Sequence, residues 1–360
     1  MKLGLVRRGF SGTGGAEAYL RRFAAAAQAA GHESVLFASG QWPEDAWPGE
    51  AVRVPGRTPR AFADSLRDAQ PRDRCDFLFS FERVWECDAY RAGDGVHAAW
   101  LERRAGPWWG RLVRHFQRKH RDLLALETTL FTSGAKRIVA NSAMVRKEIA
   151  DRFGTPPERL HVVHNGVPAW RDVPGLREET RTKLGLAEGQ YTLLFAGSGW
   201  ERKGLRFALK AVSLLPGATL LVAGRGKRRG LPKCANARFL GPQRPEEMRA
   251  LLAAADAFVL PTLYEPFSNA CLEALAAGLP VITTQANGFA EITEPGVEGE
   301  VVAAPEDATA LSAALAAWSD PDRRAAIRPR LLEKGARYSI EANVASTLEI
   351  LLGNHPTGAK

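Results

Sequence analysis

The chain has 360 residues, of which 45% are hydrophobic and 25% are charged, with 34 glycines and 22 prolines. This composition excludes a disordered chain, and the length exceeds what one hydrophobic core usually organises, so we expect two domains. The formal net charge is +9, and residues 1–168 alone carry 26 Lys and Arg against 19 Asp and Glu, a net of +7. This basic excess predicts an anionic partner for the first half: phosphates, nucleic acid or an acidic membrane surface.

The cysteines indicate neither a zinc site nor a disulfide framework, because none of them has Cys-x-x-Cys spacing. They are Cys75, Cys87, Cys234 and Cys271. The apolar run at residues 1–6 is too short for a secretory signal, and no run approaches the ~20 apolar residues of a membrane span. We therefore expect a reduced cytoplasmic protein, with at most a peripheral contact at the inner face of the cytoplasmic membrane.

The N-terminal residues predict a strand, a glycine loop and a helix in succession. The strand covers 3–6, the loop 9–15, and an alanine-rich helix runs over 16–30 before a second strand at 34–37. Such a βαβ unit is typical of parallel sheets with helices on both faces. Further apolar runs fit the same sheet, at 77–79, 137–140 and 160–163, and a long helical stretch is predicted over 108–133.

The same alternation begins again after a polar connector. Strands are expected at 191–196, 219–223, 257–260 and 280–283, with a helix over 204–215. We therefore predict an α/β protein with a Rossmann-like domain over 1–168 and a second over 169–335. The last segment, 336–360, is predicted to be a helix that crosses back to the first domain.

Two glycine-rich loops follow predicted strands, where parallel sheets bind ligands. The first contains Gly14 and Gly15, and the second contains Ser198 and continues into Arg202 and Lys203. Helix N-termini and close backbone approach suit a phosphate, and the two cations suit a diphosphate. The alternative is that the glycines only turn the chain and the cations are solvated. Neither loop matches the dinucleotide fingerprint or a Walker P-loop.

A pair of glutamates eight residues apart frames a third predicted site. Ser268 or Asn269 can cap a helix that Gly278 ends, which places Glu265 at the helix mouth and Glu273 just over one turn inside. Both carboxylates can accept hydrogen bonds from vicinal hydroxyls while the helix N-terminus meets phosphates. Two glutamates at this spacing are otherwise most often surface charges.

The surrounding residues make a longer pattern. Asp256-Ala-Phe-Val-Leu-Pro-Thr262 precedes the glutamates, and Ala277-Gly-Leu-Pro-Val-Ile282 follows them. Gly14-Gly-Ala-Glu17, Ala140-Asn-Ser142, Asn165-Gly-Val167 and Arg202-Lys-Gly204 come in the expected order. This pattern resembles glycosyltransferase family 4 over nearly the whole chain. The resemblance implies the GT-B fold, with two parallel sheets facing a central cleft, and transfer of a sugar with retention of configuration.

The resemblance also implies roles for individual residues. Glu265 would hold the donor sugar hydroxyls and Glu273 the nucleotide ribose, while Arg202 and Lys203 bind the diphosphate. Backbone N–H groups would bind sugar and phosphate around Pro266, Phe267 and Ser268. The donor would be a nucleotide sugar, UDP-glucose in the leading interpretation, with no other cofactor and no metal.

A polar residue from the first domain is expected beside the anomeric carbon. Asp94 is favoured, because an acidic group there could stabilise an oxocarbenium-like transition state, and His97 is the competitor. The alternative for Asp94 is a simple turn residue between two glycines. The resemblance implies front-face attack, in which the leaving phosphate takes the acceptor proton.

Residues 103–124 suggest the nature of the acceptor. Apolar side chains including Trp108 and Trp109 fall on one side of a predicted helix, and four arginines fall on the other. A basic amphipathic helix of this kind lies on anionic membranes, although a helix packed on its domain with a solvated basic face is an equal alternative. In the resemblance, this region corresponds to a membrane-contacting segment of enzymes that glucosylate the heptose region of the lipopolysaccharide core. Tyr19 departs from them, since they have an acidic residue there.

Three further interpretations stay open at this point. A family 4 transferase could use another nucleotide sugar and a polyprenyl-linked or other glycolipid acceptor. A non-transferring GT-B epimerase would need acid and base groups around the sugar. A nucleic-acid-binding protein would fit the pI of about 9.6, but the sequence has no recognition motif. We expect a monomer that binds no nucleic acid.

Overall fold

The computed structural model describes residues 1–10, 15–43, 46–104 and 118–352. The chain forms two compact units. The N-terminal unit runs from Met1 to His164 and includes the C-terminal helix α14 (Ile340–Leu352), and the C-terminal unit is Asn165–Ser339. Each unit contains one parallel sheet with helices, so the predicted α/β class with two Rossmann-like sheets is confirmed.

The N-terminal unit has a seven-stranded parallel sheet with the order β3-β2-β1-β4-β5-β6-β7. Its strands are β1 (Lys2–Arg7), β2 (Glu33–Ala38), β3 (Glu50–Arg53), β4 (Phe77–Ser80), β5 (Cys87–Ala92), β6 (Ala135–Ala140) and β7 (Leu160–Val162). Its helices are α1 (Gly15–Ala29), α2 (Pro59–Asp68), α3 (His97–Arg103), α5 (Arg118–Thr129), α6 (Ala143–Phe153) and α14, with a π-helical turn at Leu130–Gly134. The expected strands appear because both faces of such a sheet are buried, so its strands read as apolar runs.

The sequence analysis did not predict strands β3 and β5 of this sheet, because neither contains an apolar run. β5 carries Asp88 in its interior, where hydrogen bonds from Arg72 (2.8 Å), the Leu78 N–H (2.9 Å) and an ion pair with Lys136 (2.9 Å) satisfy the carboxylate. Although burial opposes this, these contacts lower the pKa of Asp88 below its usual value. β3 is an edge strand with mostly exposed side chains, so it needs no apolar face.

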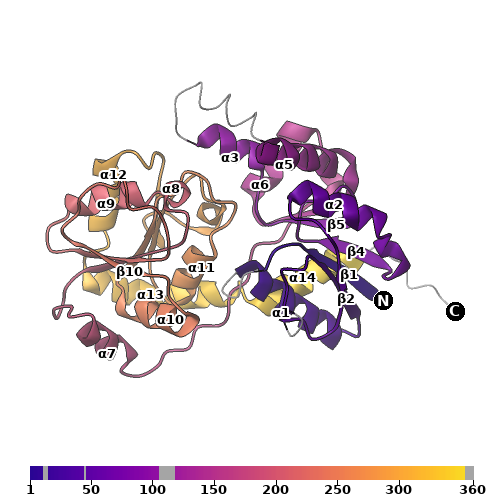
Figure 1. Ribbon diagram of the computed structural model, residues 1–360. Coiled ribbons are helices and arrows are strands. Elements are labelled where there is room, and N and C mark those ends of the chain that lie inside the picture. The colour runs from indigo at the N-terminus through magenta and orange to yellow at the C-terminus, as the bar shows by residue number, and fades with distance from the viewer. Residues whose placement is uncertain (11–14, 44–45, 105–117, 353–360) are drawn as a thin grey trace. The chain divides into compact units, whose positions relative to one another are not determined.

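The final helix belongs to the N-terminal unit. In Figure 1, α14, in yellow, lies beside the indigo helix α1. Its side chains Ile340, Val344 and Leu351 join the core that contains Phe23 of α1, and the Tyr19 hydroxyl donates to Asn343 Oδ1 at 2.5 Å. Apolar burial and this hydrogen bond fix α14 to α1.

The C-terminal unit has a six-stranded parallel sheet with the order β10-β9-β8-β11-β12-β13. Its strands are β8 (Thr192–Ala196), β9 (Thr219–Ala223), β10 (Ala237–Gly241), β11 (Ala257–Leu260), β12 (Val281–Thr284) and β13 (Gly299–Val302). Its helices are α7 (Leu176–Lys183), α8 (Trp200–Lys203), α9 (Leu205–Ser213), α10 (Pro245–Ala254), α11 (Asn269–Ala276), α12 (Ala308–Ala316) and α13 (Pro321–Ala336). The edge strands β10 and β13 are half-exposed, which is why the sequence pattern missed them.

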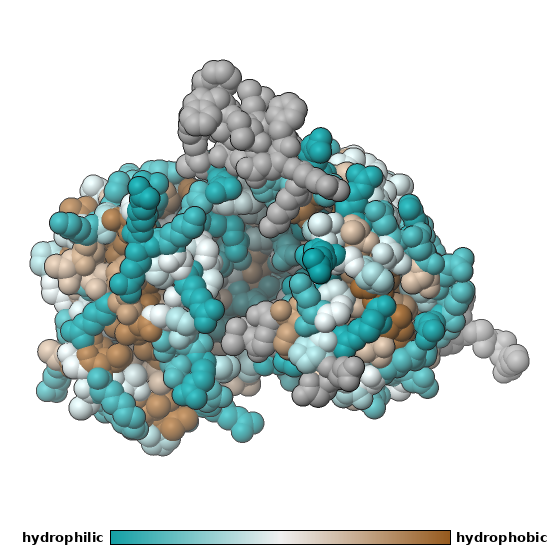
Figure 2. Space-filling model, in the orientation of Figure 1, coloured by the Kyte–Doolittle hydropathy of each residue, from teal (hydrophilic) through white to brown (hydrophobic). Residues whose placement is uncertain are grey.

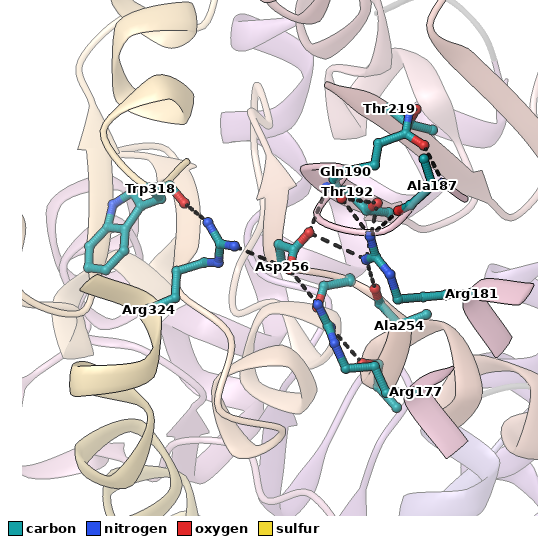
Figure 3. Close-up of polar contacts among 12 residues, drawn as sticks. Arg177, Arg181, Ala187, Gln190, Thr192, Thr219, Ala254, Asp256, Trp318 and Arg324 are labelled. Atoms are coloured by element: carbon teal, nitrogen blue, oxygen red, sulfur yellow. Dashed lines mark hydrogen bonds and ion pairs between the residues drawn. The ribbon is translucent and has the colours of Figure 1, made fainter. Parts of the chain in front are cut away.

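A buried carboxylate joins three arginines in the C-terminal unit (Figure 3). Asp256, 5% exposed, forms ion pairs with Arg177 at 2.7 Å, Arg324 at 3.4 Å and Arg181 at 3.5 Å. It also accepts the backbone N–H of Thr192 at 2.7 Å. Since the arginines come from α7 and α13 and the N–H from β8, Asp256 connects two helices to the centre of the sheet.

The surface of the described residues is mainly polar. Figure 2 shows hydrophilic side chains over most of the visible face, with hydrophobic ones in small separate patches. The exposed large hydrophobic side chains of the described residues are Met1, Val173 and Leu214. Within these described residues, no helix is long and apolar enough to cross a membrane.

Candidate active site

The order of strands reverses at one point in each sheet, and ligands of such folds bind outside the carboxyl ends of the strands at that point. In the C-terminal unit the reversal lies between β8 and β11, which are neighbours in the sheet. The loop after β8 leads to Arg202 and Lys203, and the loop after β11 leads to Glu265. Residues 63 positions apart are therefore brought to one place.

Glu265 forms ion pairs with both cations of this site. Its side chain is 10% exposed, and one oxygen, Oε2, lies 2.7 Å from Arg202 Nη1 and 2.5 Å from Lys203 Nζ. The backbone of Glu265 is fixed as well, because its N–H donates to Ala286 and its carbonyl accepts from Gly288, both at 2.9 Å. Two cations and one carboxylate leave a local charge of +1 that suits an anionic ligand.

The loop that carries the cations is bound to the loop after β11. The carbonyl of Arg202 accepts from Thr262 Oγ1 at 2.7 Å and from the N–H of Leu263 at 2.9 Å, and its Nη1 donates to the Tyr264 carbonyl at 3.1 Å. Gly204 ends α8, the short helix that contains Arg202 and Lys203, with φ +74°. A Cβ at Gly204 would lie 1.8 Å from the Pro261 carbonyl oxygen. Glycine is therefore required where the two loops touch.

The glycine loop itself lies against Lys203. A Cβ at Gly197 would be 3.5 Å from the methylenes of the Lys203 side chain, so this stem lies along the loop. Ser198 accepts a hydrogen bond from the N–H of Arg225 at 3.2 Å, and the N–H of Gly199 donates to the Arg225 carbonyl at 3.0 Å. The Ser198 hydroxyl thus orders the loop between β8 and α8.

The third predicted group forms the start of α11. Ser268 is the N-cap and accepts from the N–H of Cys271 at 3.2 Å, and Pro266 and Phe267 are buried beside it. Glu273, half-buried, lies one turn further along the helix, as the sequence predicts. The positive end of the helix dipole therefore lies a few residues from Glu265.

Cys271, in the first turn of α11, does not contribute a nucleophile. It is 0% exposed, and burial raises the pKa of its thiol to about 12. A thiol so protonated is unreactive. All four cysteines are free, consistent with the absence of a predicted disulfide.

In the N-terminal unit, the candidate residues lie after β5. Asp94 is exposed in the turn, and His97, half-buried, is the first residue of α3. His97 Nε2 lies 2.9 Å from His120 Nδ1. Gly15 is the first residue of α1, while Gly14 lies outside the described residues. Of the two candidates, the structure leaves Asp94 the more accessible.

A buried ion pair that the sequence analysis missed holds this turn. Glu127, 0% exposed, accepts the N–H groups of His97 at 2.6 Å and Ala98 at 3.1 Å, which caps α3. Arg83 lies 3.3 Å from the same carboxylate and donates to the Gly95 carbonyl at 2.8 Å. These contacts therefore fix the C-terminal side of the turn that carries Asp94. No sequence spacing indicated this pair, since its members are 44 residues apart.

A second missed group lies where the order of strands reverses in this sheet, between β1 and β4. Arg7, at the end of β1, forms ion pairs with Glu17 at 3.2 Å and Glu82 at 3.8 Å, and Arg8 lies 4.0 Å from Glu82. Burial raises the pKa of Glu82 in spite of both arginines. The sequence did contain one signal for this group: charged residues follow the apolar runs of β1 and β4.

The predicted amphipathic stretch at 103–124 is described only at its two ends. Its central part, 105–117, with both tryptophans, lies outside the described residues. Within the described part, α3 ends at Arg103 and α5 begins at Arg118, where Arg121 is exposed and Leu123 and Leu124 are half-buried.

Two family models match the chain: one described as Glycosyltransferase Family 4 over residues 13–171, and one described as Glycosyl transferases group 1 over residues 190–320. Lipopolysaccharide glucosyltransferase WaaG of Escherichia coli is 28% identical over 322 residues, covering 81% of this chain and 82% of its own length. Glycogen synthase of Mycobacterium tuberculosis is 34% identical over 250 residues, covering 65% of this chain. The chain spans about half the length of the first curated relatives it matches, including 56% of that glycogen synthase.

Solved structures agree on the fold. A crystal structure of WaaG, a glycosyltransferase involved in lipopolysaccharide biosynthesis, matches with a TM-score of 0.80 at 24% identity, covering 98% of this chain and 100% of that one. Alr3699/HepE of Anabaena, in complex with UDP and glucose, matches with a TM-score of 0.75 at 18% identity, covering 99% of this chain and 100% of that one. These likenesses show the GT-B fold. The two family models, which together match most of the chain, show that it belongs to glycosyltransferase family 4.

Proposed function

We propose that the protein is a retaining, metal-independent glycosyltransferase that moves glucose from UDP-glucose onto a lipid-linked saccharide, a heptose of the lipopolysaccharide inner core. The observation that carries the proposal is the convergence of Arg202 and Lys203 on Glu265, beside the N-terminus of α11. A nucleotide sugar offers the matching groups: a diphosphate for the cations and hydroxyls for the carboxylate.

The two cations supply the electrostatic part of the mechanism. As the bond between the anomeric carbon and the phosphate oxygen breaks, negative charge grows on the diphosphate, and fixed cations stabilise that charge more than the ground state. Lys203 is largely buried, with 12% of its side chain exposed, so its charge acts in a poorly solvated place. Glu265 would orient the sugar hydroxyls, and Glu273 would bind the ribose.

Retention follows when the acceptor attacks from the face that the diphosphate leaves. The acceptor oxygen bonds to the anomeric carbon, the diphosphate departs with the bonding electrons, and the acceptor proton passes to the departing phosphate oxygen. Asp94 would stabilise the positive charge that develops on the sugar ring. This sequence needs neither a covalent enzyme intermediate nor a metal ion.

The choice of substrates rests on the relatives. WaaG of E. coli is described as a lipopolysaccharide glucosyltransferase, and HepE of Anabaena has been crystallised with UDP and glucose. The second candidate within the same family is a transferase with another nucleotide sugar and a polyprenyl-linked or other glycolipid acceptor. It stays open because relatives with other named activities, a glycogen synthase and a D-inositol 3-phosphate glycosyltransferase, also match. A lipid-linked acceptor would place the protein at the inner face of the cytoplasmic membrane, in peripheral contact through residues 103–124.

The test is release of UDP from UDP-glucose, with and without lipid A core that carries heptose. We expect release that depends on the acceptor and that Glu265→Ala abolishes, and the anomeric configuration of the product, read by NMR, should match that of the donor. Binding of a different nucleotide sugar with no turnover of UDP-glucose would support the second candidate. If no nucleotide sugar binds, the proposal is wrong.

A further inference from the structure

Charge is distributed very unevenly in the C-terminal half of the chain. Residues 202–245 contain eleven Lys and Arg and no Asp or Glu, whereas the rest of residues 169–360 has 12 Lys and Arg against 21 Asp and Glu. The net charge of residues 169–360 is therefore close to zero only because the basic segment 202–245 offsets an acidic remainder. Arg202 and Lys203 account for only two of the eleven cations.

Five of the other cations lie together in the loop between β9 and β10, residues 224–236, which we name the basic loop. All five side chains are exposed, and none forms an ion pair with a carboxylate of the described residues. They are Arg225, Lys227, Arg228, Arg229 and Lys233. Five like charges held close together without counter-charges raise the free energy of the folded chain, which suggests a role in binding an anion.

The basic loop is held against the proposed donor site. Arg225 exchanges backbone hydrogen bonds with the glycine loop, to Ser198 Oγ at 3.2 Å and from the N–H of Gly199 at 3.0 Å. A Cβ at Gly226 would lie 2.4 Å from the indole ring of Trp200, so the loop packs directly on the residue that begins α8. The cations thus follow the carboxyl end of β9, next to the strand whose loop leads to Arg202 and Lys203.

A ring contact orders the far side of the loop. The guanidinium of Arg228 lies 4.3 Å from the ring centroid of Phe239, which in turn lies 5.6 Å from the ring of Trp200. These contacts fix the backbone at Arg225 and Gly226 and the side chain of Arg228, so the cations stay clustered at this edge of the sheet, and clustered charge produces a directed field.

The cations inside the site are less able to attract a ligand from a distance. Arg202 and Lys203 share the carboxylate of Glu265, which cancels half of their charge. The basic loop, with five exposed cations and no paired carboxylate, is the larger source of positive potential at this edge of the sheet. Its field extends about one Debye length, ~10 Å at 0.1 M salt.

We propose that the basic loop guides the diphosphate of the nucleotide sugar into the site and raises its association rate constant. This inference rests on the proposed function, since it names the donor of that same site. The loop acts on encounter, so its cations change the rate of association more than the rate of dissociation.

The experiment measures association of UDP carrying a methylanthraniloyl fluorophore by stopped-flow fluorescence, across ionic strengths. The loop variant is Arg225→Gln/Lys227→Gln/Arg229→Gln, which retains Arg228 on Phe239. We expect its association rate constant to fall on the order of tenfold at low salt, with the dissociation rate constant changed less than twofold. At about 1 M salt, where the Debye length is about 3 Å, the difference from wild type should vanish.

The matched control is Lys183→Gln/Lys210→Gln/Arg337→Gln, which removes the same charge from exposed positions outside the loop. It should associate within twofold of wild type. Equal rate constants for the loop variant and this control would overturn the inference while leaving the proposed function intact. Loss of binding to anionic phospholipid vesicles, with unchanged UDP association, would also overturn it and identify a membrane surface. If wild type binds no uridine nucleotide, both proposals fail.

Discussion

The two units place charged residues at the same topological position, but with different ratios of cations to carboxylates. In the C-terminal unit, the loops after β8 and β11 direct two cations onto one carboxylate, Glu265. In the N-terminal unit, two cations at the end of β1 meet two carboxylates: Arg7 lies between Glu17 and Glu82, and Arg8 lies 4.0 Å from Glu82. The first arrangement favours a diphosphate, whereas the second offers carboxylate oxygens to a neutral group such as a sugar hydroxyl.

This contrast suggests how one fold accommodates different substrates. The C-terminal site uses two sequence segments with short, fixed spacings. The N-terminal site draws on segments around residues 7, 17, 82 and 94, so each can change without the others. The comparison makes testable predictions, because a change in one unit should leave the other unit's function intact.

The largest effect is expected at Gly204. Gly204→Ala adds a Cβ 1.8 Å from the Pro261 carbonyl, which should separate the two loops of the donor site and abolish UDP binding, measured by isothermal titration calorimetry. Gly217→Ala is the matched control, because Gly217 has a similar φ of +81° but nothing within 4 Å of the added atom. The control should lose only the ~1–2 kcal/mol of a left-handed alanine and bind UDP normally. Equal binding by both variants would contradict the loop contact.

A change in the N-terminal unit should affect transfer without affecting the donor. Asp94→Asn removes the charge that would stabilise the transition state, so kcat should fall about 100-fold while the Kd for UDP stays within twofold of wild type. The measurement is steady-state transfer combined with UDP titration. His97→Gln is the competing variant: if it lowers kcat and Asp94→Asn does not, His97 is the residue beside the anomeric carbon.

Each unit also has a buried carboxylate that stabilises it. Neutralising the carboxylate should lower the free energy of unfolding by a different amount in each unit. Glu127→Gln leaves Arg83 without its counter-charge at a fully buried position, so the free energy of unfolding should fall by about 3–5 kcal/mol. Asp256→Asn should cost less, about 2–3 kcal/mol, because the Arg177 side chain is 40% exposed and can hydrate. Urea unfolding followed by circular dichroism measures both. A larger loss for Asp256→Asn would reverse the ranking.

The smallest effect is the response to acid. Burial tends to raise the pKa of Asp88 in the N-terminal unit and of Glu298 in the C-terminal unit. Hydrogen bonds and nearby cations outweigh burial, so both pKa values lie below their usual range. The folded state therefore binds fewer protons than the unfolded one, so stability from these groups is complete above the unfolded values near pH 4 and is lost as the pH falls through the lower folded values. Thermal unfolding between pH 3 and 6 should show this loss. Asp88→Asn/Glu298→Gln should reduce the slope, and an unchanged slope would contradict the assignment.

The sequence determined the α/β class, most strands of both parallel sheets and the segments of the candidate donor site, because buried parallel strands and helix caps leave local patterns. Strand β9 (Thr219–Ala223) and strand β11 (Ala257–Leu260) were predicted to the residue. Likewise, spacing alone placed a helix cap at Ser268 or Asn269 and Glu273 just over one turn inside the helix, and the structure assigns the cap to Ser268.

Only the tertiary structure decided which charges meet. β5 was missed because Asp88 interrupts its apolar pattern, and that charge is tolerated only because Arg72 and Lys136 reach it from other segments. The ion pair between Glu127 and Arg83 also depends on residues far apart in the chain. The same holds for the ion pairs of Asp256 with its arginines. A charged side chain gives no local sign of its partner, since a buried charge is tolerated only where folding brings an opposite charge to it, and that depends on the packing of the whole unit.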